Sequence, residues 1–128
     1  MTTYVVLLSG DEAAWAAASE EERQQVYGLH QDFGRRLTRG GHTIVAGAEL
    51  THSREAKVVR RVGEQVDITD GPAAESVEQL AGFYLVESDD LDDLLQPVAV
   101  LAAPGDGHLV DIAPAPIEVR PTTHATSG

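Results

Sequence analysis

The chain alternates between short apolar runs and segments whose apolar residues recur every three or four positions. Runs of β-branched and aliphatic residues predict strands at 4–8, 43–50 and 80–86. The runs 58–62 and 66–69 flank Gly63 and Glu64, a spacing typical of a β-hairpin. Short strands are also expected at 108–112 and 117–120.

Two segments predict amphipathic helices. Ser19 and Glu22 fit a capping box, in which each side chain satisfies a free amide at the helix start. The inner stripe of this first helix consists of Val26, Leu29, His30, Phe33 and Leu37. The inner stripe of the second helix consists of Leu91, Leu94, Leu95, Val98 and Leu101. Pro97 predicts a kink or an early stop there, and the alanine-rich segment around Trp15 is expected to be a connector.

The order strand, helix, strand, hairpin, strand, helix, strand predicts an α+β fold with a ferredoxin-like sheet and two helices on one sheet face. We expect one domain at residues 1–121, followed by a flexible C-terminal tail at 122–128. A sheet with one helical layer leaves its other face apolar. A second copy of the chain is the simplest cover for that face, so a homodimer is expected.

Composition narrows the choice of partners and location. The chain has 21 Asp and Glu against 9 Lys and Arg, and the resulting charge of -12 repels phosphate backbones and anionic lipid. No nucleic acid or membrane partner is therefore expected. The absence of cysteine fits a reducing compartment, and the run at 4–8 lacks the flanks of a signal peptide. A cytoplasmic location is the expectation.

No cofactor or metal is expected, because the sequence has no glycine-rich phosphate loop and its five histidines lack paired metal-ligand spacing. The candidate chemistry rests on His30, which lies on the first helical stripe, and on Asp70 at the turn after the hairpin. A carboxylate that orients an imidazole makes a minimal proton-transfer pair. The alternative is a core histidine bonded to a backbone carbonyl, with Asp70 only holding its turn.

Other polar residues near the turn have two interpretations each. Glu75 and Glu78 are either additional acids in a cleft or solvated charges at its rim. Phe83 and Tyr84 alternate along their strand, so one ring faces the core and the other the opposite face. A buried Tyr84 hydroxyl requires a polar partner.

Residues 70–78 read Asp-Gly-Pro-Ala-Ala-Glu-Ser-Val-Glu, and Gly82-Phe83-Tyr84 follows. This segment resembles the Asp-Gly-Pro-Phe-Ala-Glu-Thr-Lys-Glu pattern of the DGPF subgroup of YCII-related domain proteins. Segments 4–15, 21–23, 30–33, 66–69, 89–92 and 117–121 also look like family positions. The chain departs from the pattern at Ala73, where the family usually has phenylalanine, and at Val77, where it often has lysine.

The resemblance implies a ferredoxin-like fold in the dimeric α+β barrel group. It also implies an active-site pair of a helix histidine and an aspartate, which fall on His30 and Asp70 here. The function expected on this basis is cofactor-free acid-base chemistry on a small organic molecule, of isomerase, lyase or hydrolase type. The alternative is a non-catalytic dimeric module that binds a ligand or acts as a regulatory accessory.

Overall fold

The structure is a computed structural model that describes residues 1–102, 107, 109 and 111–125. Its centre is an antiparallel sheet in the strand order β2-β5-β1-β6. The strands are β1 (Thr2–Asp11), β2 (Thr43–Glu49), β5 (Glu78–Ser88) and β6 (Ile117–Pro121). The helices are α1 (Glu12–Ala17), α2 (Glu20–Arg39) and α3 (Leu91–Ala99). The predicted α+β fold with a ferredoxin-like strand order is confirmed.

The start of α2 follows from its sequence. Ser19 Oγ accepts from the Glu22 amide at 3.1 Å, and the Glu22 carboxylate accepts from the Ser19 amide at 2.9 Å, so the capping box forms. Val26, Phe33 and Leu37 from the predicted stripe are buried. The segment around Trp15 is not a connector. It forms α1, because the Asp11 carboxylate accepts from the Ala14 amide and caps a run of alanines.

The second predicted helix ends early, at Ala99, two residues beyond Pro97. Its inner stripe is narrower than predicted, since Leu91 and Leu95 are exposed while Leu94, Val98 and Leu101 are buried. The strand expected at 108–112 is wrong for the residues that can be judged: Leu109, Asp111 and Ile112 form turns, and positions 108 and 110 lie outside the described residues. Pro114 lies two residues after Ile112 and has no N–H to donate to a strand ladder.

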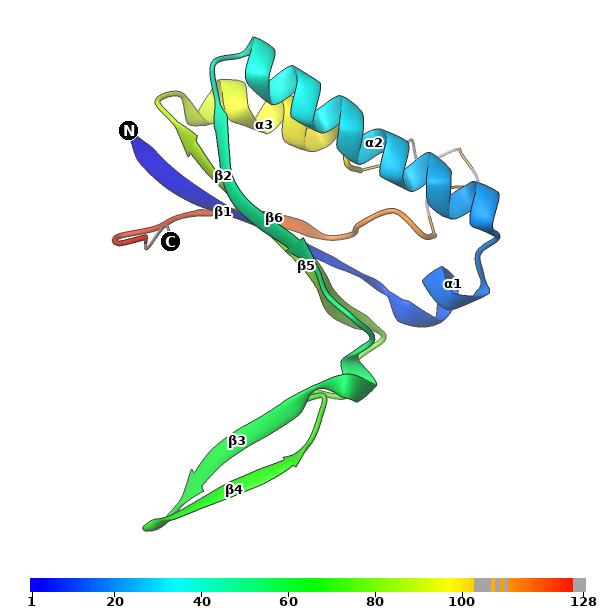
Figure 1. The fold of residues 1–128 in the computed structure, drawn as a ribbon, viewed down its shortest axis with the longest axis vertical. Coiled ribbons are helices and arrows are strands. Elements are labelled where there is room, and N and C mark those ends of the chain that lie inside the picture. The colour runs from blue at the N-terminus through cyan, green and yellow to red at the C-terminus, as the bar shows by residue number, and fades with distance from the viewer. Residues whose placement is uncertain (103–106, 108, 110, 126–128) are drawn as a thin grey trace.

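The core lies between the sheet and the helices α2 and α3, which cover the same face of the sheet (Figure 1). It contains Tyr4, Val6 and Leu8 from β1, Val86 from β5, and Phe33, Leu37, Leu94, Val98 and Leu101 from the helical side. Side chains alternate along a strand, so Val5 and Leu7 point to the other face. There they pair across strands with Leu85 and Phe83. No helix of the described residues covers this second face, which we call the open sheet face (Figure 1).

A hairpin of β3 (Lys57–Val62) and β4 (Gln65–Asp70) extends away from the main sheet, joined to β2 through the 3-10 turn η1 (Ser53–Glu55) (Figure 1). The hairpin was predicted, but its separation from the sheet was not. Val59 and Ile68 form a cross-strand pair and are 65% and 68% exposed. A lone two-stranded hairpin is marginally stable in water, so these side chains require a cover.

At the C-terminal side, Thr122 donates its amide and its hydroxyl to the Thr3 carbonyl, at 2.9 and 2.7 Å. The first residue after β6 is therefore bound to β1. In the part of the chain that the structure describes, no helix has the length and apolar character needed to cross a membrane.

Candidate functional site

A pocket of about 360 Å³ opens between α2 and the strands β2 and β5. Its walls are mostly apolar and include Leu8, Trp15, Val26, Leu50 and Ile112. The polar groups among its described residues are few: His30, Tyr84, Tyr27, Glu49 and Ser9. An apolar hollow with a small number of fixed polar groups is the usual form of a small-molecule site.

His30 and Tyr84 meet inside this pocket although they lie 54 residues apart in the chain. His30 Nδ1 is 2.7 Å from the Tyr84 hydroxyl oxygen. The Tyr84 ring also packs against Phe33 of the core, with ring centroids 5.0 Å apart. The Tyr84 hydroxyl thus has the polar partner that burial demands, and His30 is held by a side chain rather than by a backbone carbonyl. His30 Nε2 has no hydrogen-bond partner among the described residues.

Burial sets the protonation of this pair. Desolvation lowers the pKa of His30 below 6.5, while the negative charge of Glu49 acts in the opposite direction. Desolvation, assisted by the same Glu49 charge, raises the pKa of Tyr84. Near neutral pH the pair is therefore a neutral imidazole hydrogen-bonded to a protonated phenol.

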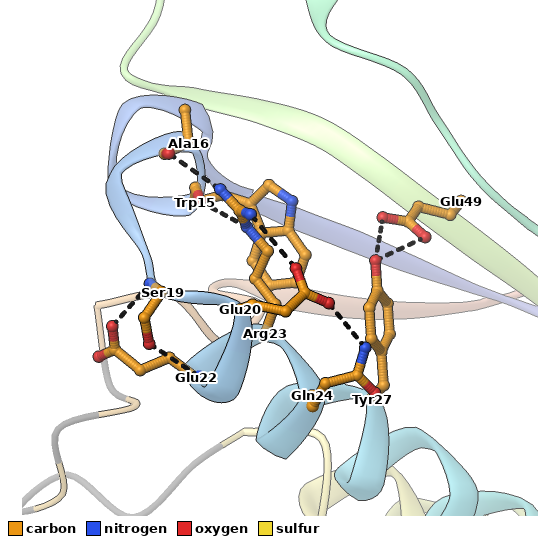
Figure 2. Close-up of polar contacts among 9 residues, drawn as sticks. All are labelled: Trp15, Ala16, Ser19, Glu20, Glu22, Arg23, Gln24, Tyr27 and Glu49. Atoms are coloured by element: carbon orange, nitrogen blue, oxygen red, sulfur yellow. Dashed lines mark hydrogen bonds and ion pairs between the residues drawn. The ribbon is translucent and has the colours of Figure 1, made fainter.

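Tyr27 and Glu49 form a second polar contact at the same pocket (Figure 2). The Tyr27 hydroxyl donates to the Glu49 carboxylate, with its oxygen 3.0 and 3.2 Å from the two carboxylate oxygens. Burial first, and this hydrogen bond second, raise the pKa of Tyr27. The contact ties α2 to the end of β2 and holds a carboxylate at the pocket.

Asp70 is in a different environment from His30. Its carboxylate pairs with the Lys57 ammonium across the hairpin, and this contact lowers the pKa of Asp70. The Asp70 side chain is 80% exposed and is not among the described residues that line the pocket. Glu75 and Glu78 are also exposed and outside it. Of the predicted pair, the single chain places only His30 in the pocket.

The sequence did not single out Glu49 or Tyr27, and for Tyr84 it predicted only that a buried hydroxyl would need a polar partner. Two signals could have found them. Tyr27 precedes His30 by three positions, so both lie on the same face of α2. Gly47 pairs with Tyr84 across strands, and Glu49 shares a strand face with Gly47. The sequence does not predict that the β2 face with Gly47 and Glu49 lies against the α2 face with Tyr27 and His30.

A further hollow of about 400 Å³ adjoins the pocket and shares Trp15, Glu49, Leu50 and Ala81 with it. Its other carboxylate, Glu12, accepts from the Ser53 amide and hydroxyl, both at 2.7 Å. His52 Nε2 lies 3.4 Å from Glu12. Glu12 is thus occupied in fastening α1 to η1. Among the described residues, no group of three or more His, Asp or Glu side chains is arranged to hold a metal ion.

A Ser-His-Asp arrangement lies outside the pocket. His42 Nδ1 is 2.8 Å from Ser88 Oγ, and His42 Nε2 is 2.7 Å from an Asp93 carboxylate oxygen. A serine, a histidine and an aspartate bonded in this order are typical of a catalytic nucleophile with its base. However, Ser88 is only 1% exposed and also bonds to the Asp90 backbone, so no substrate can reach its hydroxyl. This network holds the end of α2 against β5 and α3.

The Gly47→Ala variant should disturb the His30–Tyr84 pair. A Cβ at Gly47 would lie 2.8 Å from Tyr84 Cδ1 and 3.0 Å from the Phe83 carbonyl, so the Tyr84 ring must move. We expect a loss of about 1–3 kcal/mol in unfolding free energy, as for other overpacked sites, together with shifted NMR signals of the His30 ring.

Gly34→Ala is the matched control for this change, because a Cβ there meets nothing within 4 Å and alanine favours a helix. It should raise the unfolding free energy by up to about 1 kcal/mol and leave the His30 signals in place. Unchanged His30 signals in Gly47→Ala would show that Gly47 is not required for the position of the Tyr84 ring.

Two comparisons place the chain among known proteins. A family model described as the YCII-related domain matches residues 2–113, which include His30, Glu49, Asp70 and Tyr84. An uncharacterised protein from Rhizobium meliloti (strain 1021) is 34% identical over 92 residues, covering 72% of this chain and 73% of that protein. The match thus spans most of the fold and the pocket. The chain belongs to the YCII-related domain family.

Proposed function

We propose that this protein binds a small, mostly apolar organic molecule in the pocket and uses His30 to transfer a proton to or from it. The observation that carries the proposal is a half-buried imidazole in an apolar hollow, with Nδ1 held by Tyr84 at 2.7 Å and Nε2 without a partner among the described residues. A base of this kind is effective when its pKa lies near the working pH.

Neutral His30 acts as a base, and the imidazolium that it forms can return the proton to the ligand, while the Tyr84 hydroxyl decides which ring nitrogen is free. When the hydroxyl donates to Nδ1, the proton of neutral His30 is on Nε2 and can form a hydrogen bond to a ligand. When the hydroxyl accepts from Nδ1–H, Nε2 has a free lone pair and can take a proton from a ligand. Because burial raises the pKa of Tyr84, the phenol keeps its own proton in both cases. Isomerisation, elimination and hydrolysis all use such a transfer.

Asp70 enters the proposal through a second copy of the chain. In the single chain its carboxylate is on the hairpin and pairs with Lys57. A homodimer that buries the exposed Val59–Ile68 pair of one hairpin against the other subunit could bring Asp70 to the pocket of that subunit. The open sheet face offers a second apolar surface for the same contact.

A non-catalytic ligand-binding module is the second candidate. It is favoured by the exposure of Asp70, because no carboxylate of the described residues is then hydrogen-bonded to His30. Binding alone needs the apolar walls and the fixed polar groups but no coupled acid-base pair. The two functions differ in whether Asp70 influences the protonation of His30.

An NMR pH titration of the His30 ring tests the proposal. The ring should titrate with a pKa below 6.5, because burial disfavours the imidazolium. In Glu49→Gln the pKa should fall further, since the removed carboxylate stabilises the charged ring. A ring that does not titrate between about pH 4 and pH 8 contradicts the proton-transfer role.

Two variants complete the titration. A fall of the His30 pKa in Asp70→Asn would support the His30–Asp70 pair across a dimer, and no change would favour the binding module. His30→Ala should remain folded with native-like circular dichroism, because the ring is only half-buried. An unfolded His30→Ala protein would instead indicate a structural role for His30.

A further inference from the structure

One carboxylate lines the described part of the pocket. Among the described residues that line it there is no Lys or Arg, and Glu49 is its carboxylate. Desolvation lowers the pKa of His30, which disfavours a positive charge on its ring. An anionic ligand would therefore lose its hydration beside a like charge and find no counter-ion. A cationic group on the ligand would instead be attracted to the Glu49 carboxylate.

Glu49 is fixed but not neutralised. The Glu49 carboxylate accepts from the Tyr27 hydroxyl, which is a neutral donor. No Lys, Arg or His of the described residues forms an ion pair with Glu49. Glu12 in the adjoining hollow differs, since it accepts two hydrogen bonds from Ser53 and lies 3.4 Å from His52 Nε2. A carboxylate has about four acceptor positions, so Glu49 can bind an ammonium group while it still accepts from Tyr27.

The walls beside Glu49 are aromatic. The Trp15 and Tyr27 rings meet edge to face with centroids 5.7 Å apart (Figure 2). Aromatic faces attract cations, and one cation already lies here: the Arg23 guanidinium carbon is 5.8 Å from the Trp15 ring centre. Arg23 is held by the Trp15 and Ala16 carbonyls, at 3.2 and 2.9 Å. Arg23 thus lies against Trp15 and forms no ion pair with Glu49, so the Glu49 carboxylate can bind a cationic group of a ligand.

We propose that the pocket binds a small aromatic amine, with its ring between the apolar walls and its ammonium group on Glu49; this rests on the small-molecule function proposed above. The volume of about 360 Å³ is at the lower end of ligand sites and suits a compact molecule. The net charge of -12 adds long-range attraction for cations.

Calorimetric titration of the full chain with benzylamine, benzyl alcohol and benzoate tests this inference, because the three probes share a ring and differ in charge. At about pH 7.5 benzylamine is an ammonium ion. Benzylamine should bind at least about tenfold more tightly than benzyl alcohol, as expected for one charge-assisted hydrogen bond, and benzoate most weakly. Glu49→Gln should remove the preference for the amine and leave the affinity for the alcohol unchanged.

Glu64→Gln is the matched control, since it removes the same charge at the hairpin turn, outside the pocket. It should keep the preference for the amine. Equal or tighter binding of the alcohol, or a preference that survives Glu49→Gln, overturns the amine inference and leaves the pocket proposal intact. No binding of any probe at millimolar concentration overturns both.

Discussion

Replacing Leu85 by aspartate should convert the proposed homodimer into a monomer. Leu85 lies at the centre of the open sheet face, on β5, between Val5 of β1 and Ala46 of β2. If a second copy covers this face, the new carboxylate is buried without a partner, which costs several kcal/mol. We expect the dissociation constant to rise by a factor of about a thousand, equivalent to about 4 kcal/mol.

Analytical ultracentrifugation measures this result directly. The wild type should sediment with twice the chain mass of 13.6 kDa, and Leu85→Asp with the chain mass itself. Leu95→Asp is the matched control, because Leu95 is 40% exposed on α3, away from the open sheet face. It should remain dimeric. A monomeric wild type, or a dimer that tolerates Leu85→Asp, rules out pairing through this face.

His42→Ala should cause a large loss of stability. His42 is 6% exposed and joins three elements through Ser88 and Asp93. Alanine removes a hydrogen bond to a carboxylate, leaves Ser88 without its histidine partner and opens a cavity. Together these effects should lower the unfolding free energy by about 2–4 kcal/mol, measured by urea denaturation at constant m-value.

His52→Ala provides the comparison, because its ring is 35% exposed and lies 3.4 Å from Glu12. Its loss should cost at most about 1 kcal/mol, as for other exposed pairs. If His42→Ala costs no more than His52→Ala, the buried network does not hold the helices to the sheet. If His42→Ala also changes ligand binding, the network influences the pocket in addition to the fold.

The elements could be predicted from the sequence where local interactions decide them. The capping box at Ser19 and Glu22 involves residues three positions apart, and the β3–β4 hairpin closes over a two-residue turn. Alternation along β1 and β5 also determined which residues enter the core. The failures have local causes as well: Asp11 caps a helix that the alanines were not expected to form, and turns replace the strand expected near Ile112.

By itself the sequence determined the main helices and strands, their ferredoxin-like order and the place of His30 on a helix face. Only the tertiary structure decided what His30 contacts. The choice of Tyr84 over Asp70 depends on how α2 packs on β5, across 54 residues, and on the hairpin extending away so that Asp70 faces Lys57. Glu49 likewise accepts a hydrogen bond from Tyr27 because the end of β2 lies beside α2. Such contacts depend on packing between distant segments, which periodicity and short motifs do not encode.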